Sequence, residues 1–266
     1  MMYKIKYLIF LMILFSCSSE PKSGWDKYLF SDDILSAEEF IDQDLLSTHI
    51  TKLSSDEFQG RKPATPGGKK TVKYLIDSFQ GIGLKPGNPN GSWTQDVKML
   101  GVKSNLRSQF ITDDERWVLR TGDDIIGNSY IKKQNVNLER VGVIFCGYGI
   151  TAPEYKWDDY KGVDVKGKVV IILVNDPPIM NNDEYDNDMF KGKAMTYYGR
   201  WSYKYEEALR RGAAGAIVIH ESGPAGYPFS VLQAGHDSES LTIEASKSLK
   251  FQGWLPLSSA QKLFSM

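Results

Sequence analysis

The stretch that most constrains the fold is ALRRGAAGAIVIHES, residues 208–222. It begins with residues that favour a helix, passes through Gly212, and continues as a small and β-branched run that ends at His220. A glycine readily takes the left-handed conformation that ends a helix, and a short apolar run bounded by turn residues is typical of a buried strand. We therefore expect a helix from about Tyr203 to Gly212, packed closely on a sheet that includes a strand over 215–220.

Two further runs predict neighbouring strands of the same kind. They are VGVIFCGYGI at 141–150 and GKVVIILVN at 167–175, both rich in β-branched residues and bounded by glycine. Such runs are expected in strands that are buried on both faces. Shorter runs lie near 241–244 and 255–257. Because strands and helices are mixed along the chain, we expect an α/β fold.

The part of the chain before these strands predicts two helices and a pair of strands. The first helix covers 37–53 and has a Ser-x-x-Glu capping box at its start. The second begins at Thr65-Pro66, a cap residue followed by proline, and Gly81 ends it. Alternation of apolar and polar residues predicts a strand over 93–100, for which 106–111 is a candidate partner.

The first residues have the pattern of a bacterial export signal. Lys4 and Lys6 precede an apolar run, 7–15, that is too short to span a bilayer of about 30 Å as a helix. The run ends in LFSC, which resembles a lipobox, where the chain is cut before a cysteine that is then acylated. We therefore expect Cys17 to carry a lipid anchor and 18–35 to form a tether. The protein would then be exported and anchored to a membrane of the cell envelope, and the alternative is a plain secretory signal.

Charge and cysteine content exclude some partners and crosslinks. The sequence has 32 Lys and Arg against 33 Asp and Glu, a formal charge of −1, and its basic residues are scattered. No nucleic-acid partner is therefore expected. If Cys17 is acylated, Cys146 is the one cysteine left, and no intrachain disulfide can form. Cys146 lies in an apolar run, which favours a buried core thiol over a nucleophile.

The three histidines of the sequence offer no complete metal site. His49 lies on or beside the apolar stripe of the first helix, and His236 lies in a polar loop. His220 begins a segment like the His-Glu-x-x-His zinc motif, but Pro224 stands where the second histidine belongs. A zinc site needs three or four converging ligands, so each histidine is interpreted as structural. The motifs of a serine nucleophile elbow, a phosphate-binding loop and a dinucleotide site are missing from the sequence as well.

Aromatic and basic side chains gather where the helix before 215–220 begins. Flat rings beside a guanidinium often line recognition surfaces. The alternative is that these rings pack the start of the helix onto the sheet. The residues are Tyr197, Tyr198, Arg200, Trp201, Tyr203 and Tyr205.

Two blocks of the sequence resemble the protease-associated (PA) domain that is inserted in co-catalytic di-zinc aminopeptidases of peptidase family M-twenty-eight. They are 141–178, VGVIFCGYGITAPEYKWDDYKGVDVKGKVVIILVNDPP, and 192–221, GKAMTYYGRWSYKYEEALRRGAAGAIVIHE. The segment 49–87 is similar to the two N-terminal helices of the peptidase domain in that family. The blocks stand in the family's order, and the resemblance covers about 45–260.

The resemblance implies an incomplete zinc-exopeptidase α/β domain that carries an inserted, β-rich α+β PA domain. The signal would occupy 1–17 and the tether 18–35. The N-terminal part of the peptidase domain would follow over 36–114 and the PA domain over 115–250. Residues 251–266 would begin the return to the peptidase domain.

The resemblance also implies an enzyme whose catalytic residues lie elsewhere. Members of the family hold two zinc ions with His, Asp and Glu ligands, and a Glu serves as general base to a bridging water. In relatives with this insert, a His-x-Asp motif, a Glu-Glu pair, a further Asp and a distal His follow the PA domain. No His-x-Asp occurs in this sequence, so no catalytic or metal-ligating residue is carried over. We expect the chain to be the N-terminal portion of a longer enzyme, inactive and without zinc by itself, with apolar helix faces left exposed.

The expected parent protein is therefore a membrane-anchored, exported zinc aminopeptidase that releases N-terminal residues from peptides. Its PA domain would shape the access of peptide substrates, and Tyr198, Arg200 and Trp201 are the expected contacts. The rival hypothesis is a non-catalytic surface lipoprotein that binds peptides or a partner protein through its PA domain. A third hypothesis, a carbohydrate-binding module, is supported by the aromatic residues alone and is the weakest of the three.

Overall fold

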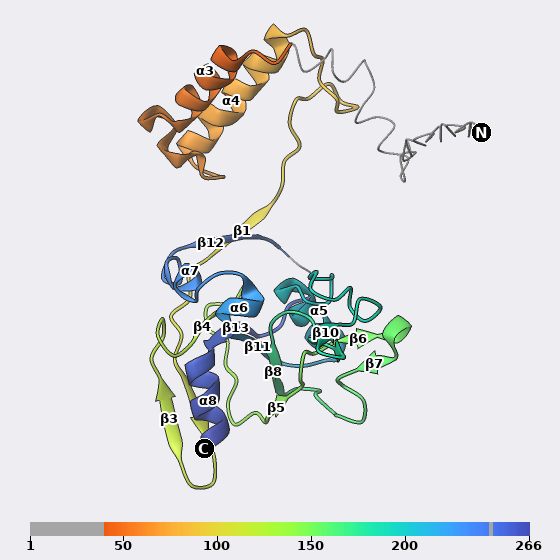
Figure 1. The fold of residues 1–266 in the computed structure, drawn as a ribbon. Helices are drawn as coiled ribbons and strands as arrows, with labels where there is room; N and C mark the ends of the chain where they lie inside the picture. Colours follow the sequence, from red (N-terminus) through yellow and green to blue (C-terminus); the bar gives the residue numbers. More distant parts are fainter. Residues whose placement is uncertain (1–39, 245–246) are drawn as a thin grey trace, which may run out of the picture. The chain divides into compact units, whose positions relative to one another are not determined.

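The computed structural model describes residues 40–244 and 247–266 of the chain (Figure 1). The predicted signal, Cys17 and the tether 18–35 lie outside the described residues. The chain divides into two compact units, with the division between Gln95 and Asp96. Each unit is described by itself.

The first unit is built from two helices, α3 (Gln43–Ser54) and α4 (Pro66–Gly81), joined through the 3-10 helix η1 (Asp56–Arg61). The predicted start of α4 is confirmed, because the Thr65 hydroxyl accepts a hydrogen bond from the backbone N–H of Gly68. The sequence features that predicted α4 are thus the ones that form its cap.

The predicted start of the first helix is wrong. α3 begins at Gln43, because the Asp42 carboxylate accepts hydrogen bonds from the N–H groups of Asp44 and Leu45, at 2.8 and 3.0 Å. An aspartate in this position satisfies two of the N–H groups that a helix start leaves without partners. The capping box that predicted a helix from residue 37 lies outside the described residues.

The two helices leave apolar side chains in solvent. No residue of α3 is buried, and in α4 the one buried residue is Gly67. The prediction of exposed apolar helix faces is confirmed for these two helices. The exposed residues include Leu45, Leu46, Ile50, Val72 and Phe79. Phe58 of η1 is buried and meets the Tyr74 ring edge-on, with the ring centroids 5.8 Å apart.

The predicted pairing of 93–100 with 106–111 is wrong. The first strand, β1 (Met99–Val102), pairs antiparallel with β12 (Ser240–Ile243), far along the chain. The second segment forms a hairpin of β2 (Ser108–Ile111) with β3 (Arg116–Leu119). The hairpin forms because Thr112 and Glu115 close a tight turn, so β2 meets the strand that follows it at once.

The second unit is organised around a five-stranded sheet in the order β4-β13-β11-β8-β5. Four neighbouring strands are parallel, and β4 (Ile126–Asn128) pairs antiparallel at one end. β5 (Val143–Phe145), β8 (Val169–Leu173) and β11 (Gly215–His220) are the strands predicted from the three apolar runs. β13 (Phe251–Pro256) lies beside β11. The expected α/β fold is confirmed at this level, as a mixed sheet packed with helices.

Helices cover both faces of the sheet, and the alternation of side chains along the strands divides the core between them. Val170, Ile172, Ala216 and Val218 lie in one cluster with Tyr205 and Ala208 of α5 (Trp201–Arg210). Val169, Ile171, Ile217 and Ile219 lie in a second cluster with Ala260 of α8 (Leu257–Ser265). Successive side chains of a strand point to opposite faces, so the unit has two apolar layers.

The junction at the centre of the opening sequence feature is confirmed. α5 ends before Gly212, which has a φ of +78°, and β11 begins at Gly215. Gly212 O then accepts a hydrogen bond from Gly167 N at 2.9 Å, which joins the helix end to the start of β8. The left-handed glycine thus turns the chain back into the sheet.

Small elements complete the second unit. Two short hairpins stand in the loops that follow β5 and β8. They are β6 (Thr151–Ala152) with β7 (Trp157–Asp158), and β9 (Met180–Asn181) with β10 (Glu184–Tyr185). Single-turn helices are η2 (Pro153–Tyr155), α6 (Ser222–Ala225) and α7 (Ser230–Gln233). β13 and α8, which the resemblance assigns to the peptidase domain, belong to the same compact unit as β5, β8 and β11.

Candidate binding surface

An exposed surface lies where the chain enters α5. We call Met195, Tyr197, Arg200 and Trp201 the aromatic surface. All four residues are exposed, Tyr197 to 53% and Trp201 to 51%. The backbone N–H of Asn175, just past β8, donates to Gly199 O at 3.1 Å. The aromatic surface therefore lies at the carboxyl edge of the parallel strands, where open α/β sheets commonly bind ligands.

The three residues predicted as peptide contacts do not form one cluster. Tyr198 packs with Tyr155, Phe190 and Tyr203, while Trp201 contacts the rings of Tyr205 and Trp254. Arg200 is exposed and is the N-cap residue of α5, with extended backbone. Some rings of the cluster therefore pack the helix start onto the sheet, and others face solvent.

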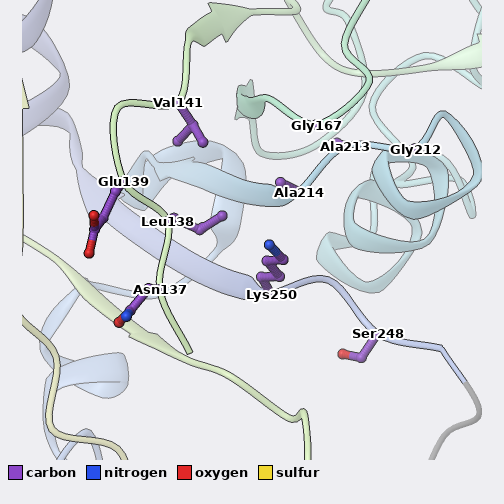
Figure 2. A pocket seen from close by; sticks show the side chains of 10 residues that line it. All are labelled: Asn137, Leu138, Glu139, Val141, Gly167, Gly212, Ala213, Ala214, Ser248 and Lys250. Atoms are coloured by element: carbon purple, nitrogen blue, oxygen red, sulfur yellow. The ribbon is translucent and has the colours of Figure 1, made fainter. Parts of the chain in front are cut away.

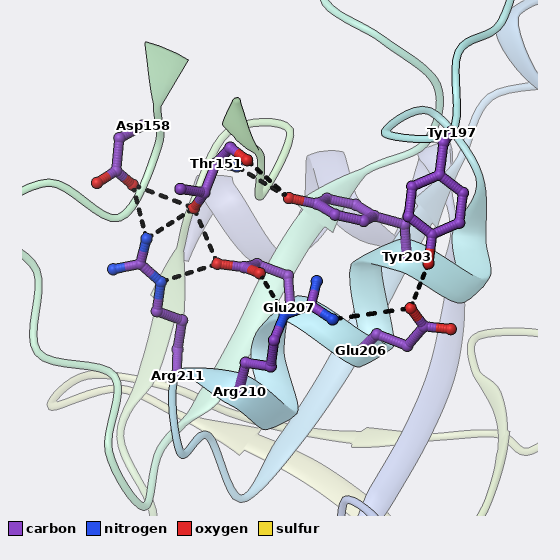
Figure 3. Close-up of polar contacts among 8 residues, drawn as sticks. All are labelled: Thr151, Asp158, Tyr197, Tyr203, Glu206, Glu207, Arg210 and Arg211. Carbon is purple, nitrogen blue, oxygen red and sulfur yellow. Dashed lines mark hydrogen bonds and ion pairs between the residues drawn. The ribbon is translucent and has the colours of Figure 1, made fainter. Parts of the chain in front are cut away.

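Tyr198 is tied down by its hydroxyl group. The phenol donates a hydrogen bond to the Glu154 carboxylate at 2.6 Å. This hydrogen bond, with some burial, raises the pKa of Tyr198 to about 12. Its neighbour Tyr197, which was not among the three predicted contacts, is more exposed, and its hydroxyl donates to Glu206 (Figure 3). The two adjacent tyrosines thus differ in exposure and in hydrogen-bond partner, and their spacing along the sequence does not reveal this difference.

A buried lysine holds the helix that carries this surface. Lys204 is 0% exposed, and its ammonium donates to the carbonyl oxygens of Tyr148 and Asn175, at 2.6 and 3.0 Å. Those carbonyls follow β5 and β8, so one side chain links α5 to the ends of two strands. Burial lowers the pKa of Lys204 to about 7, against the opposing effect of the Asp176 and Asp159 carboxylates.

A buried aspartate fixes the loop that leads into the aromatic surface. Asp176 accepts hydrogen bonds from the backbone N–H of Thr196 at 2.6 Å and from its hydroxyl at 2.9 Å. Burial raises the pKa of Asp176, and the bonds from Thr196 oppose this rise. Asn175 takes a φ of +71°, a conformation that asparagine tolerates better than most residues. Both ends of the loop over 175–199 are therefore fixed beside the sheet.

A second polar network joins α5 to the β6–β7 hairpin (Figure 3). The buried Glu207 carboxylate accepts from Thr151 Oγ1 at 2.8 Å, Arg210 Nε at 2.8 Å and Arg211 Nε at 2.9 Å. Arg211 also pairs with Asp158 at 3.2 Å. Burial would raise the pKa of Glu207, but the hydrogen bonds from the two arginines and Thr151 outweigh it and lower that pKa. These groups are satisfied by one another, so the network is a structural support for α5.

The histidines and Cys146 take the structural positions that were expected. His49 Nδ1 lies 2.6 Å from the Tyr74 hydroxyl, and His236 Nδ1 lies 2.8 Å from Gln233 O. His220 is buried among the rings of Tyr227, Phe229 and Trp254. Cys146 is a buried free thiol, whose pKa burial raises to about 11.

Among the residues that the structure describes, no three His, Cys, Asp or Glu side chains lie close enough together to hold a metal ion. His220 Nε2 has no hydrogen-bond partner in this part of the chain, but its neighbours are aromatic rings that supply no further ligand. The described residues therefore do not fit a zinc centre.

An open cavity of about 430 Å³ lies near the amino ends of the strands (Figure 2). Its lining includes the backbone around Gly212 and Ala214 and the charged residues Glu139 and Lys250. The amide groups of Ala214 and Lys250 already bond within the sheet. These backbone amides are thus not free for a ligand, and we take the aromatic surface as the better candidate.

No family profile and no curated protein matches this chain. None of the helices in residues 40–244 and 247–266 combines the length and the hydropathy needed to cross a bilayer.

Proposed function

We propose that the chain is the N-terminal portion of an exported, membrane-anchored zinc metallo-aminopeptidase, in which a PA-type domain over 115–250 shapes the access of peptide substrates. The single observation that carries this proposal is the resemblance of 141–178 and 192–221 to the PA domain, in the family's order. The two segments contain β5, β8, α5 and β11, which are neighbours in one sheet and its covering helix.

The aromatic surface supports a role in holding peptides. Exposed rings and a guanidinium at the carboxyl edge of a sheet suit the mixture of apolar side chains and backbone groups in a peptide. Met195 and Tyr197 are exposed beside the predicted contacts Arg200 and Trp201, while Tyr198 is half-buried. The described residues do not fit a zinc site, so the two zinc ions belong to the proposal for the longer protein.

A non-catalytic surface lipoprotein is the second candidate. The observation that favours it is the aromatic surface, whose exposed side chains can contact a peptide without a metal. In this case the second unit would bind peptides or a partner protein without cleaving them.

Reading the gene beyond codon 266 separates the two candidates. The enzyme requires downstream His-x-Asp and Glu-Glu motifs in one reading frame, and the full product should bind two zinc ions and hydrolyse aminoacyl anilides. A stop codon directly after Met266, with peptide binding but no zinc and no turnover, would establish the binding protein instead.

The lipid anchor is tested separately. Cells that express the chain are grown with a radiolabelled fatty acid, which should be incorporated into the wild-type protein and not into Cys17→Ala. A label that persists in Cys17→Ala would contradict acylation at this cysteine, and the plain secretory signal would then be the better account.

A further inference from the structure

We propose that β5, the open edge strand of the sheet, binds an extended peptide as an added strand. This inference rests on the proposed peptide-binding function and assigns it a second contact region, away from the aromatic surface. Figure 1 shows β5 beside β8 at the margin of the sheet, and β5 is the last strand in the sheet order.

The backbone of β5 presents a short row of hydrogen-bonding groups to solvent. Cys146 N donates to Ile171 O at 2.9 Å, and Val169 N donates to Gly142 O at 3.0 Å. Since alternate residues of a strand bond to opposite sides, Gly142, Ile144 and Cys146 face β8. Val143 and Phe145 therefore direct their N–H and C=O groups away from the sheet, and in the described part of the chain these groups have no hydrogen-bond partner.

Natural sheets protect their edges with short strands, charged side chains, proline or a bulge. Of these features, β5 has only its short length of three residues. The sequence over 141–146 is Val-Gly-Val-Ile-Phe-Cys and contains neither a charge nor a proline. Its register with β8 is regular from Val143 to Phe145. An edge without charge, proline or bulge can accept a short added strand as a way to bind a partner.

Apolar side chains beside the edge offer contacts to alternate residues of an added strand. Val143 and Phe145 are 42% and 47% exposed, although they belong to a strand of the central sheet. The Phe145 ring meets the exposed ring of Phe264 in α8 edge-on, with a centroid distance of 5.2 Å. An extended peptide with an apolar residue at every second position matches this pair of rings.

The length of the edge favours a peptide over a second copy of this chain. β5 has three residues, of which two present backbone groups, so self-pairing across a two-fold axis would form only four hydrogen bonds. A stable dimer buries about 800 Å² on each partner, far more than a three-residue strand supplies. Short peptides, in contrast, commonly bind sheet edges through a few main-chain hydrogen bonds.

The test is a titration of the full, isotope-labelled chain with the probe acetyl-Thr-Val-Thr-Phe-Thr-amide, followed by NMR. We expect saturation to slow hydrogen exchange at the amides of Val143 and Phe145 by about tenfold or more. The same peptide with every internal amide N-methylated keeps its side chains but loses its donors. It should bind about tenfold more weakly, because main-chain hydrogen bonds carry the affinity.

A pair of protein variants completes the test. Val143→Lys places a charge at the edge and should weaken binding by at least about threefold. Val118→Lys adds the same charge at an exposed position of β3 and should leave binding unchanged. An unaltered amide spectrum elsewhere in each variant shows that the fold is kept.

Each contrary result has a distinct meaning. Equal binding of both peptides, or equal loss in both variants, would overturn strand addition. Shifts confined to Tyr197 and Trp201 would overturn it as well but would leave the proposed peptide-binding function standing. Protection of Val143 and Phe145 without peptide, with dimers in sedimentation, would show that a second copy occupies the edge. No binding anywhere would overturn both strand addition and the peptide-binding role of the aromatic surface.

Discussion

The helical hairpin α3–α4 and the sheet unit differ in how far they bury their apolar side chains. In the sheet unit, β8 and β11 are buried on both faces by α5 and α8. In the hairpin, the helices are defined by local features such as the Asp42 and Thr65 caps, while their apolar faces lie in solvent. Most helical stability in proteins comes from packing an apolar face rather than from local preference. The sheet unit thus carries its own core, whereas the described residues of the hairpin leave their apolar faces exposed.

The largest change in the free energy of unfolding is expected for a substitution in the core of the sheet unit. Ile172→Ala should destabilise the sheet unit by about 2–5 kcal/mol, because it leaves a cavity at a residue that is fully buried in β8. Its matched control is Leu46→Ala in α3, where the side chain is 52% exposed and the loss should stay within about 0.5 kcal/mol.

Denaturant unfolding followed by tryptophan fluorescence and far-ultraviolet circular dichroism measures both variants. If Leu46→Ala costs as much as Ile172→Ala, the hairpin has a packed core of its own and the contrast between the two regions fails.

The second prediction concerns the buried Lys204 of the sheet unit. The described residues of the hairpin include no buried lysine. Its folded pKa of about 7 lies below the ordinary value of 10.5, so between these values the unfolded chain binds more protons than the folded chain. The free energy of unfolding should therefore rise by about 2 kcal/mol between pH 7 and pH 9. Lys204→Met removes the titrating group and should abolish this part of the rise.

The measurement is urea unfolding at pH 7, 8 and 9, with the exposed Lys161→Met as control. A wild-type stability that is flat or falls over this range would contradict the lowered pKa. A slope that is equal in wild type and Lys204→Met would assign the pH dependence to other groups.

Local sequence signals predicted the elements that local chemistry determines. The glycine at 212, the cap at 65 and the β-branched runs at 169–173 and 215–220 each specify a conformation through neighbouring residues. The pairing of β1 with β12 was missed, because contact between residues 99–102 and 240–243 depends on the folded chain. Alternation shows that a strand is present but not which strand lies beside it.

The candidate site was predicted in part for a similar reason. The composition of 197–205 marked a surface, but which rings face solvent depends on the packing of Phe190 and Trp254 against them. Lys204 and Asp176 gave no signal, because a lysine in a helix and an aspartate before two prolines are ordinary on a surface. Only the fold brings the Lys204 ammonium to the carbonyls of Tyr148 and Asn175.

The third prediction tests how tightly the sheet unit is packed beneath the aromatic surface. A Cβ at Gly199 would approach Met195 Cγ to 2.8 Å and Asp176 Oδ2 to 2.9 Å. Gly199→Ala should therefore cost about 1–2 kcal/mol of stability, since overpacking forces neighbours to shift. Gly223→Ala is the matched control, because nothing lies within 4 Å of its added Cβ.

Thermal unfolding compares these two alanine variants. An equal change in both would mean that the loop around Gly199 yields easily, and that Asp176 does not fix it as the hydrogen bonds indicate.

The smallest effect compares two helix starts, one from each region. Asp42→Ala removes the carboxylate that caps α3 and should cost about 1 kcal/mol of local stability, because the N–H groups of Asp44 and Leu45 lose their acceptor. Arg200 is the N-cap of α5 but provides no side-chain cap, so Arg200→Ala should change stability by less than about 0.5 kcal/mol.

Amide hydrogen exchange in α3 and α5 measures the effects of the two substitutions. Faster exchange in α3 of Asp42→Ala alone would mean that the hairpin depends on its caps where the sheet unit depends on packing. Unchanged exchange in α3 would mean that the Asp42 cap contributes little to the stability of this helix.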